Sequence, residues 1–179
     1  MPECLHQRHL EPMPSSSAET RATDHAVQGI SVIIPTYERP QALRRCLQAL
    51  ARLRRGDLEL EVIVVNDGGA PLAVDDLIGA LPGLRVIDQV NSGPAGARNT
   101  GIAHARYQHL AFTDDDCVPE PDWITDLAAG LRRHPMALIG GRTVNLLRDN
   151  LFSETSQILV DAFCRLAECQ PREWSIPAE

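Results

Sequence analysis

The chain has 179 residues, enough for one domain with a real core, and a formal net charge of -7. This acidic balance, without a stripe of basic and aromatic side chains, argues against a nucleic-acid partner. No apolar stretch approaches the roughly 20 residues of a transmembrane segment, and the amino terminus lacks the basic and then apolar layout of a signal peptide.

Residues 1–28 precede the first regular pattern. They carry three prolines, a run of three serines and no hydrophobic period, so we expect a disordered tail. Order begins with the β-branched run at residues 30–34, which ends at Pro35 as a buried parallel strand would.

Strand and helix patterns then alternate along the chain. Further strands are expected at residues 61–65, 84–87, 110–112 and 136–141. Helices are expected from Pro40 to the stop at Gly56, and at residues 74–81, 94–107, 123–134 and 152–167. This alternation predicts an α/β fold with a mostly parallel sheet flanked by helices.

Three consecutive acids, Asp114, Asp115 and Asp116, directly follow the strand expected at residues 110–112. Adjacent carboxylates repel one another unless a cation or a hydrogen-bond network compensates. Oxygen ligands of this kind suit a hard divalent ion, Mg²⁺ or Mn²⁺. The alternative is a solvated acidic turn that caps the helix beginning near Trp123.

Polar residues also follow the first two expected strands, at residues 35–38 and 66–68. The carboxyl ends of parallel strands share one edge, where open α/β sheets bind ligands. An aromatic ring at Tyr37 can stack on a base, an acid can accept base or ribose hydrogens, and a metal can neutralise a diphosphate. Taken singly, Tyr37 is more often a packing residue and Asp67 a turn residue. Their conjunction with the three acids favours a nucleotide diphosphate site.

Four segments together resemble the family 2 glycosyltransferases: residues 31–37, 64–69, 91–102 and 112–116. The resemblance covers about residues 30–144, in the order typical of that family. It implies a GT-A fold and an inverting transfer of a hexosyl group from a nucleotide-diphospho-sugar, with a divalent metal, to an acceptor hydroxyl. It implies uracil as the donor base, with guanine and thymine as alternatives, and it leaves the sugar and the acceptor open.

The resemblance also assigns roles to residues. It implies that Tyr37 stacks on the base, that Asp67 binds the polar edge of the base, and that Asp116 is the main metal ligand, with Asp114 as the second. Asn66 departs from the commoner Asp. The nucleotide-binding residues that the resemblance implies are Pro35, Thr36, Tyr37, Glu38, Asp67, Arg98, Asn99, Asp114 and Asp115.

In the family, the catalytic base is an acid in the second half of the domain, after a Gly-Gly-Phe-type segment. No acid of this chain has that setting, so no catalytic residue is assigned. The acids after Gly141 are Asp149, Glu154, Asp161, Glu168, Glu173 and Glu179. We therefore expect a nucleotide-sugar-binding domain at residues 29–145 and, at residues 146–179, a helical remnant of a truncated acceptor half.

Two functions stay open from the sequence: a family 2 glycosyltransferase, and a truncated, non-catalytic nucleotide-sugar-binding chain. A nucleotidyltransferase and a Rossmann dehydrogenase are disfavoured, because no glycine-rich loop follows the first expected strand. The segment at residues 170–174 is similar to the QxxRW motif of processive synthases, but its spacing is wrong.

Five scattered cysteines form neither a CxxC pair nor a zinc spacing. Reduced thiols are therefore the expectation. This indicates a cytoplasmic protein, with peripheral attachment to a membrane as the alternative. The cysteines are Cys4, Cys46, Cys117, Cys164 and Cys169.

Overall fold

The computed structural model describes residues 27–140 together with Val144 and Ile158. Of the described residues, those from 27 to 137 belong to one compact unit, and a second unit begins at Leu138. The sheet and its helices lie in the first unit. Within the described residues, no helix is both long enough and apolar enough to cross a bilayer.

Four parallel strands form the sheet, in the order β3-β2-β1-β4. The strands are β1 (Gly29–Thr36), β2 (Glu59–Asn66), β3 (Leu84–Asp88) and β4 (His109–Phe112). The helices are α1 (Pro40–Leu50), α2 (Asp75–Ile78), α3 (Gly93–His104) and α4 (Trp123–Arg133). The predicted α/β class with a parallel sheet is confirmed.

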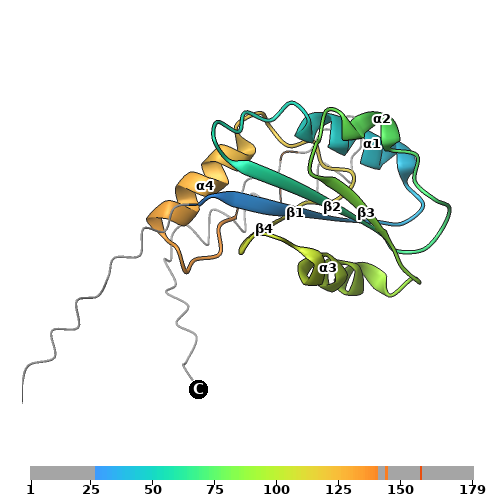
Figure 1. Cartoon of the computed structure of the whole chain (residues 1–179). Helices are drawn as coiled ribbons and strands as arrows, with labels where there is room; N and C mark the ends of the chain where they lie inside the picture. The colour runs from blue at the N-terminus through green and yellow to red at the C-terminus, as the bar shows by residue number, and fades with distance from the viewer. Residues whose placement is uncertain (1–26, 141–143, 145–157, 159–179) are drawn as a thin grey trace, which may run out of the picture. The chain divides into compact units, whose positions relative to one another are not determined.

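Helices cover both faces of the sheet, with α1 and α2 on one face and α3 on the other (Figure 1). Because side chains alternate along a strand, Val32 and Ile34 pack with α1 while Ile33 lies on the α3 side. Burial on both faces explains why β1 and β2 are nearly continuous runs of valine and isoleucine. The larger core cluster joins β1 and β2 to α1, α2 and α4, and the smaller one joins β2 to α3.

The α3 helix approaches β1 closely at Gly101. A Cβ atom at this position would lie 2.4 Å from Cγ2 of Ile33. The absence of a side chain at Gly101 therefore allows α3 to pack closely against β1. On the same face of the sheet, Glu61 is buried and accepts hydrogen bonds from Ser31 Oγ at 2.7 Å, the Arg106 N–H at 2.8 Å and Arg85 Nη1 at 3.0 Å.

Several boundaries differ from the prediction. The α1 helix ends at Leu50, and Gly56, with φ of +54°, belongs to a later turn. The α2 and α3 helices are shorter than expected. Residues 136–140 form no strand, which corrects the expected fifth strand, and Met136 and Leu138 are 98% and 99% exposed. An apolar run becomes a strand only where its backbone groups pair with a neighbour, and none of the described strands pairs with this run.

Other expectations fall outside the described residues. Of the expected tail, only Val27 and Gln28 are described, and Val27 is buried in the core. Gly141 and the expected helix at residues 152–167 lie outside, apart from Ile158, which is helical and exposed. The boundaries proposed for the domain and for the C-terminal segment stay predictions.

Candidate functional site

The ends of β1, β2 and β4 meet at the carboxyl edge of the sheet. Thr36 pairs in register with Asn66, and the Asp67 N–H donates to the Thr36 carbonyl at 2.9 Å. On the other side of β1, the Thr113 N–H donates to the Ile33 carbonyl at 3.3 Å. The polar residues after three strands are thus brought to one edge, as the topology predicted.

The three acids after β4 differ sharply in exposure. The Asp115 side chain is 0% exposed, whereas the side chains of Asp114 and Asp116 are 55% and 54% exposed. Thr36 Oγ1 donates to Oδ2 of Asp115 at 2.6 Å. Asp115 therefore ties the acidic turn to the end of β1, and its two neighbours face solvent. These acids do not cap α4, because the N-cap residue of that helix is Asp122.

Two arginines pair with the acidic turn. Arg39, the N-cap residue of α1, places Nη2 2.6 Å from Oδ1 of Asp115 and Nη1 2.9 Å from Oδ2 of Asp116. Burial opposes the charge of Arg39, but the carboxylates of Asp115 and Asp116 outweigh it and raise the pKa of the guanidinium. On α3, Arg98 Nη2 lies 2.6 Å from Oδ1 of Asp114.

The contact between Arg39 and Asp115 is an ion pair rather than an aligned hydrogen bond. Oδ1 of Asp115 is fully buried and accepts no well-aligned hydrogen bond within the described residues, although the guanidinium is close. Buried carboxylates are costly without such compensation. The charge of Arg39 is therefore the main electrostatic partner of this oxygen.

Asp67 fastens the end of β2 to the start of α3. Its Oδ1 accepts hydrogen bonds from the Ser92 N–H at 2.8 Å and from Gln89 Nε2 at 2.6 Å. Burial alone would raise the pKa of this carboxyl, but the donors, including the Gly93 N–H, outweigh burial and lower the pKa. Asp67 is thus an ionised acceptor in a donor-rich corner of the site.

Tyr37 and Glu38 lie beside the glycine turn after β2. Tyr37 is 49% exposed, and a Cβ atom at Gly68 would lie 3.6 Å from its Cε2 atom. Glu38 has φ of +51°, in the left-handed region that non-glycine residues seldom adopt. Its Cγ atom would lie 3.1 Å from a Cβ atom at Gly69. The turn glycines therefore leave room for the Tyr37-Glu38 segment, which presents an accessible aromatic ring at the edge.

The other predicted residues lie nearby on the chain. Pro35 is buried in β1 and pairs in register with Val65. Asn99 is exposed on α3, one residue after Arg98. Arg39 is the participant that sequence reasoning missed. Its partners lie 76 and 77 positions further along the chain, and the only local signal was its place before the Pro40 helix start.

The donor set of the edge fits a divalent metal that is shared with a ligand. Mg²⁺ is commonly held by one or two carboxylates together with phosphate oxygens, rather than by an all-protein cage. Asp114 and Asp116 supply two exposed carboxylates. Among the residues described, no group of three or more His, Cys, Asp or Glu side chains is arranged to hold a metal.

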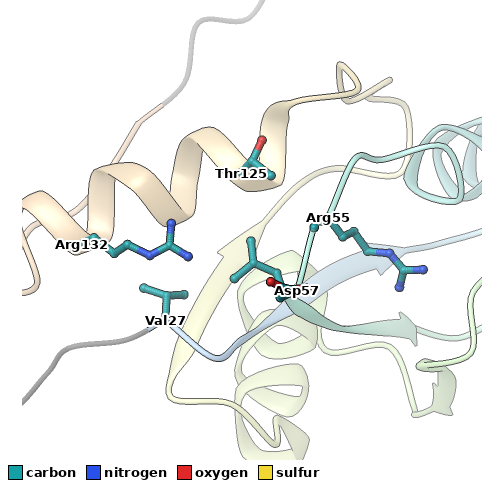
Figure 2. Close-up of a pocket in the computed structure, with 7 residues that line it drawn as sticks. Val27, Arg55, Asp57, Thr125 and Arg132 are labelled. Carbon is teal, nitrogen blue, oxygen red and sulfur yellow. The ribbon is translucent and has the colours of Figure 1, made fainter.

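The structure has two pockets of note. One, of about 290 Å³, lies near the amino ends of β1 and β2 and is lined by Val27, Asp57, Thr125 and Arg132, with Arg55 at its rim (Figure 2). The other, of about 380 Å³, lies at the start of α1 and is lined by Glu38, Arg39 and Arg45. We place the candidate site at the carboxyl edge of the sheet, which shares Glu38 and Arg39 with the second pocket.

Comparison with known proteins identifies the family. The model of the family described as glycosyl transferase family 2 matches residues 31–172. The chain belongs to this family. Membership confirms the resemblance seen in the four sequence segments and places the chain among glycosyltransferases.

Curated relatives agree with the assignment. The pre-mycofactocin glycosyltransferase of Mycobacterium tuberculosis is 37% identical over 120 residues, which are 66% of this chain and 24% of that protein. Glycosyltransferase AglE of Haloferax volcanii is 31% identical over 116 residues, which are 63% of this chain and 38% of that protein. The chain thus spans about a quarter to two fifths of the length of these family 2 relatives.

A solved structure shows the same fold. Residues 1–349 of Staphylococcus aureus TarS match with a TM-score of 0.52 and 26% identity, covering 65% of this chain and 38% of that chain. The TarS fragment has also been crystallised with UDP and with UDP-GlcNAc. The match confirms a fold of the GT-A type for this family 2 member.

Proposed function

We propose that the carboxyl edge of the sheet binds a nucleotide-diphospho-sugar, a UDP-sugar, together with Mg²⁺ or Mn²⁺. The chain would catalyse transfer of that sugar to an acceptor hydroxyl, with inversion of configuration at the anomeric carbon. The observation that carries the proposal is the meeting of Tyr37, Asp67 and the exposed acids Asp114 and Asp116 at one sheet edge. The UDP and UDP-GlcNAc complexes of TarS support the nucleotide assignment.

Each side chain has a part in the proposed site. Tyr37 stacks on the base with its exposed ring, and Asp67 accepts hydrogens from the polar edge of the base. Asp114 and Asp116 hold the metal. Glu38, Arg98 and Asn99 line the nucleotide pocket. Pro35 and Thr36, whose buried hydroxyl donates to Asp115, fix the end of β1 beside it.

Asp115 is given a different part from its neighbours. It was expected to contact the nucleotide, but its side chain is fully buried against Thr36 and Arg39. We assign it the task of holding the acidic turn in place.

The proposed reaction breaks the bond between the anomeric carbon and the diphosphate oxygen while the acceptor oxygen bonds to that carbon from the opposite side. The nucleoside diphosphate leaves with the bonding electrons, and the acceptor proton passes to a general base. A divalent metal bound here supplies charge stabilisation for the leaving diphosphate. No residue is assigned as this base, and all the acids that follow Gly141 in the sequence lie outside the described residues.

A thermal-shift experiment tests donor binding. A ligand that binds only the folded chain raises its melting temperature by mass action. We expect UDP with Mn²⁺ to raise it more than UDP alone, and more than GDP or dTDP with Mn²⁺. A melting temperature that none of the three nucleotides changes would refute the proposed site.

The alternative function, nucleotide-sugar binding without transfer, shares this donor site. A radiolabelled UDP-sugar incubated with Mn²⁺ and a panel of acceptors separates the two. Labelled product in an amount that depends on Mn²⁺ supports transfer. Binding in the thermal-shift experiment without any labelled product favours the non-catalytic alternative.

A further inference from the structure

Arg39 is tied to two of the three acids at once. Its Nη2 atom lies 2.6 Å from Oδ1 of the buried Asp115, and its Nη1 atom lies 2.9 Å from Oδ2 of the exposed Asp116. The two contacts are unequal in character. With the guanidinium in place Asp115 is 0% exposed, whereas the Asp116 side chain is 54% exposed and its contact is open to solvent.

Asp116 is also the acid assigned as the main metal ligand. A metal ion at this carboxylate would compete with Nη1 of Arg39 for Oδ2. The buried contact with Asp115 would persist, because releasing it would leave a desolvated carboxylate with no charge partner. The guanidinium would therefore stay within reach of the metal site after giving up Asp116.

We infer that Arg39 holds Asp116 in the unliganded chain, and that it yields Asp116 and donates to the diphosphate when metal and nucleotide bind together. This inference rests on the proposed function. Anchored on Asp115, the released Nη1 donor then faces the anionic ligand rather than Asp116. A planar guanidinium with several donors suits this exchange between a carboxylate and a phosphate.

The local backbone supports a fixed position for Arg39. The preceding residue, Glu38, is in the left-handed region with φ of +51°. The following residue, Pro40, begins α1, and the Arg39 carbonyl accepts the Leu43 N–H at 3.1 Å. The exchange therefore needs only side-chain movement, since the backbone on both sides is held by the turn and by the helix.

The inference predicts opposite changes for two ligands. Without the positive charge of Arg39, Mn²⁺ alone should bind more tightly, because it no longer competes with a guanidinium for Asp116. UDP in the presence of Mn²⁺ should bind more weakly, because a donor to the diphosphate is lost. We expect each affinity to change by about three- to tenfold, as suits a partly exposed charge pair.

The experiment compares the parent with Arg39→Gln, Arg39→Lys and the control Arg44→Gln. Arg44 is on the same helix and pairs with Asp76, away from the acidic turn. Loss of the free Mn²⁺ paramagnetic resonance signal measures the binding of metal alone, and calorimetry measures UDP at saturating Mn²⁺. Arg39→Gln should shift the two affinities in opposite directions, Arg39→Lys should shift them less, and Arg44→Gln should leave both unchanged.

A double variant guards against misfolding. If Arg39→Gln alone fails to fold because Asp115 keeps an uncompensated charge, Arg39→Gln with Asp115→Asn removes that charge and should show the same opposite shifts. Unchanged affinities, or two affinities that move in the same direction, would overturn the inference. A parent that binds neither Mn²⁺ nor UDP would refute the proposed function itself, and the inference with it, before any variant is compared.

Discussion

Asn66 and Asp88 lie side by side at the ends of β2 and β3. They pair in register, and Asn66 Nδ2 donates to Oδ1 of Asp88 at 2.7 Å and to the Ala70 carbonyl at 3.1 Å. Asp is the commoner residue at position 66 in the resembled pattern. The amide is explained by its neighbour, because a carboxylate here would face another carboxylate and lose both donated hydrogen bonds.

We therefore expect Asn66→Asp to lower the free energy of unfolding by about 1 kcal/mol at neutral pH, since Asp88 is exposed and the repulsion is screened. Urea denaturation measures the change. Adding Asp88→Asn to the variant should recover most of the loss, because it restores a neutral partner. If Asn66→Asp and the parent had the same free energy of unfolding, a charge at position 66 would not affect its contact with Asp88.

The sequence could identify the acidic turn but not the different parts of its three residues. Three identical side chains in a row carry no signal for which one is buried. That difference arises from the backbone, which turns Asp115 toward Thr36 and leaves Asp114 and Asp116 outward. Arg39 was missed for a related reason, because a pair so distant in sequence follows from the folded topology and from no local pattern.

At the scale of elements, the contact between α3 and β1 depends on a residue without a side chain. We expect Gly101→Ala to lower the free energy of unfolding by about 1–2 kcal/mol, as overpacking against Ile33 outweighs the gain in helix propensity. Chemical denaturation of the purified variant measures this change.

Gly79→Ala is the matched control for that substitution. Gly79 follows α2 with an ordinary helical conformation, and a Cβ atom there would meet nothing within 4 Å. It should leave stability unchanged or raise it slightly. If Gly101→Ala were no less stable than Gly79→Ala, the close approach of α3 to the sheet would be less tight than described.

The types of the elements were predictable, and their ends were less so. Continuous apolar runs identified β1 and β2, because strands that are buried on both faces need them. The prediction of a fifth strand was wrong, because an apolar run such as residues 136–140 forms a strand only beside another strand with which its backbone can hydrogen-bond. The first helix was expected to run to Gly56, but the chain leaves the helix after Leu50 and makes turns before β2.

At the scale of the whole molecule, Glu61 connects three strands and the turn after α3. Its carboxylate accepts from Ser31 on β1, from Arg85 on β3 and from the backbone of Arg106. Burial alone would raise the pKa of Glu61, but these donors outweigh burial and lower it below its ordinary value of 4.5. A carboxyl whose pKa is lower in the folded than in the unfolded state stabilises the fold at pH values above the unfolded pKa. This stabilisation is lost as the pH falls through the folded pKa.

We expect Glu61→Gln to lower the free energy of unfolding by about 1–3 kcal/mol at pH 7, because donors are left without an ionised acceptor. The difference from the parent should shrink as the pH falls below 4.5, the ordinary value for Glu. Denaturation at a series of pH values measures it, with Glu59→Gln, an exposed position on the same strand, as the control. A difference that stays constant across the series would contradict the assigned charge.

The fold class and the sheet edge at which we propose the site both followed from the order of strand and helix patterns. Parallel strands must end together, so polar residues after β1, β2 and β4 had to meet. The sequence pattern could not predict the hydrogen bonds and ion pairs between residues far apart in the chain. These contacts determine the charge and exposure of each polar residue. The location of the proposed donor site is therefore predictable from the sequence, whereas the electrostatics of that edge require the structure.

Calorimetric titration of UDP in the presence of Mn²⁺ tests the central claim most directly. The titration compares the parent with Asp116→Ala and with Asp57→Ala, which removes an exposed acid near the amino edge of the sheet. The account predicts Mn²⁺-dependent binding of UDP to the parent and to Asp57→Ala, and its loss in Asp116→Ala. Binding of UDP and Mn²⁺ to Asp116→Ala with the affinity of the parent would contradict the account.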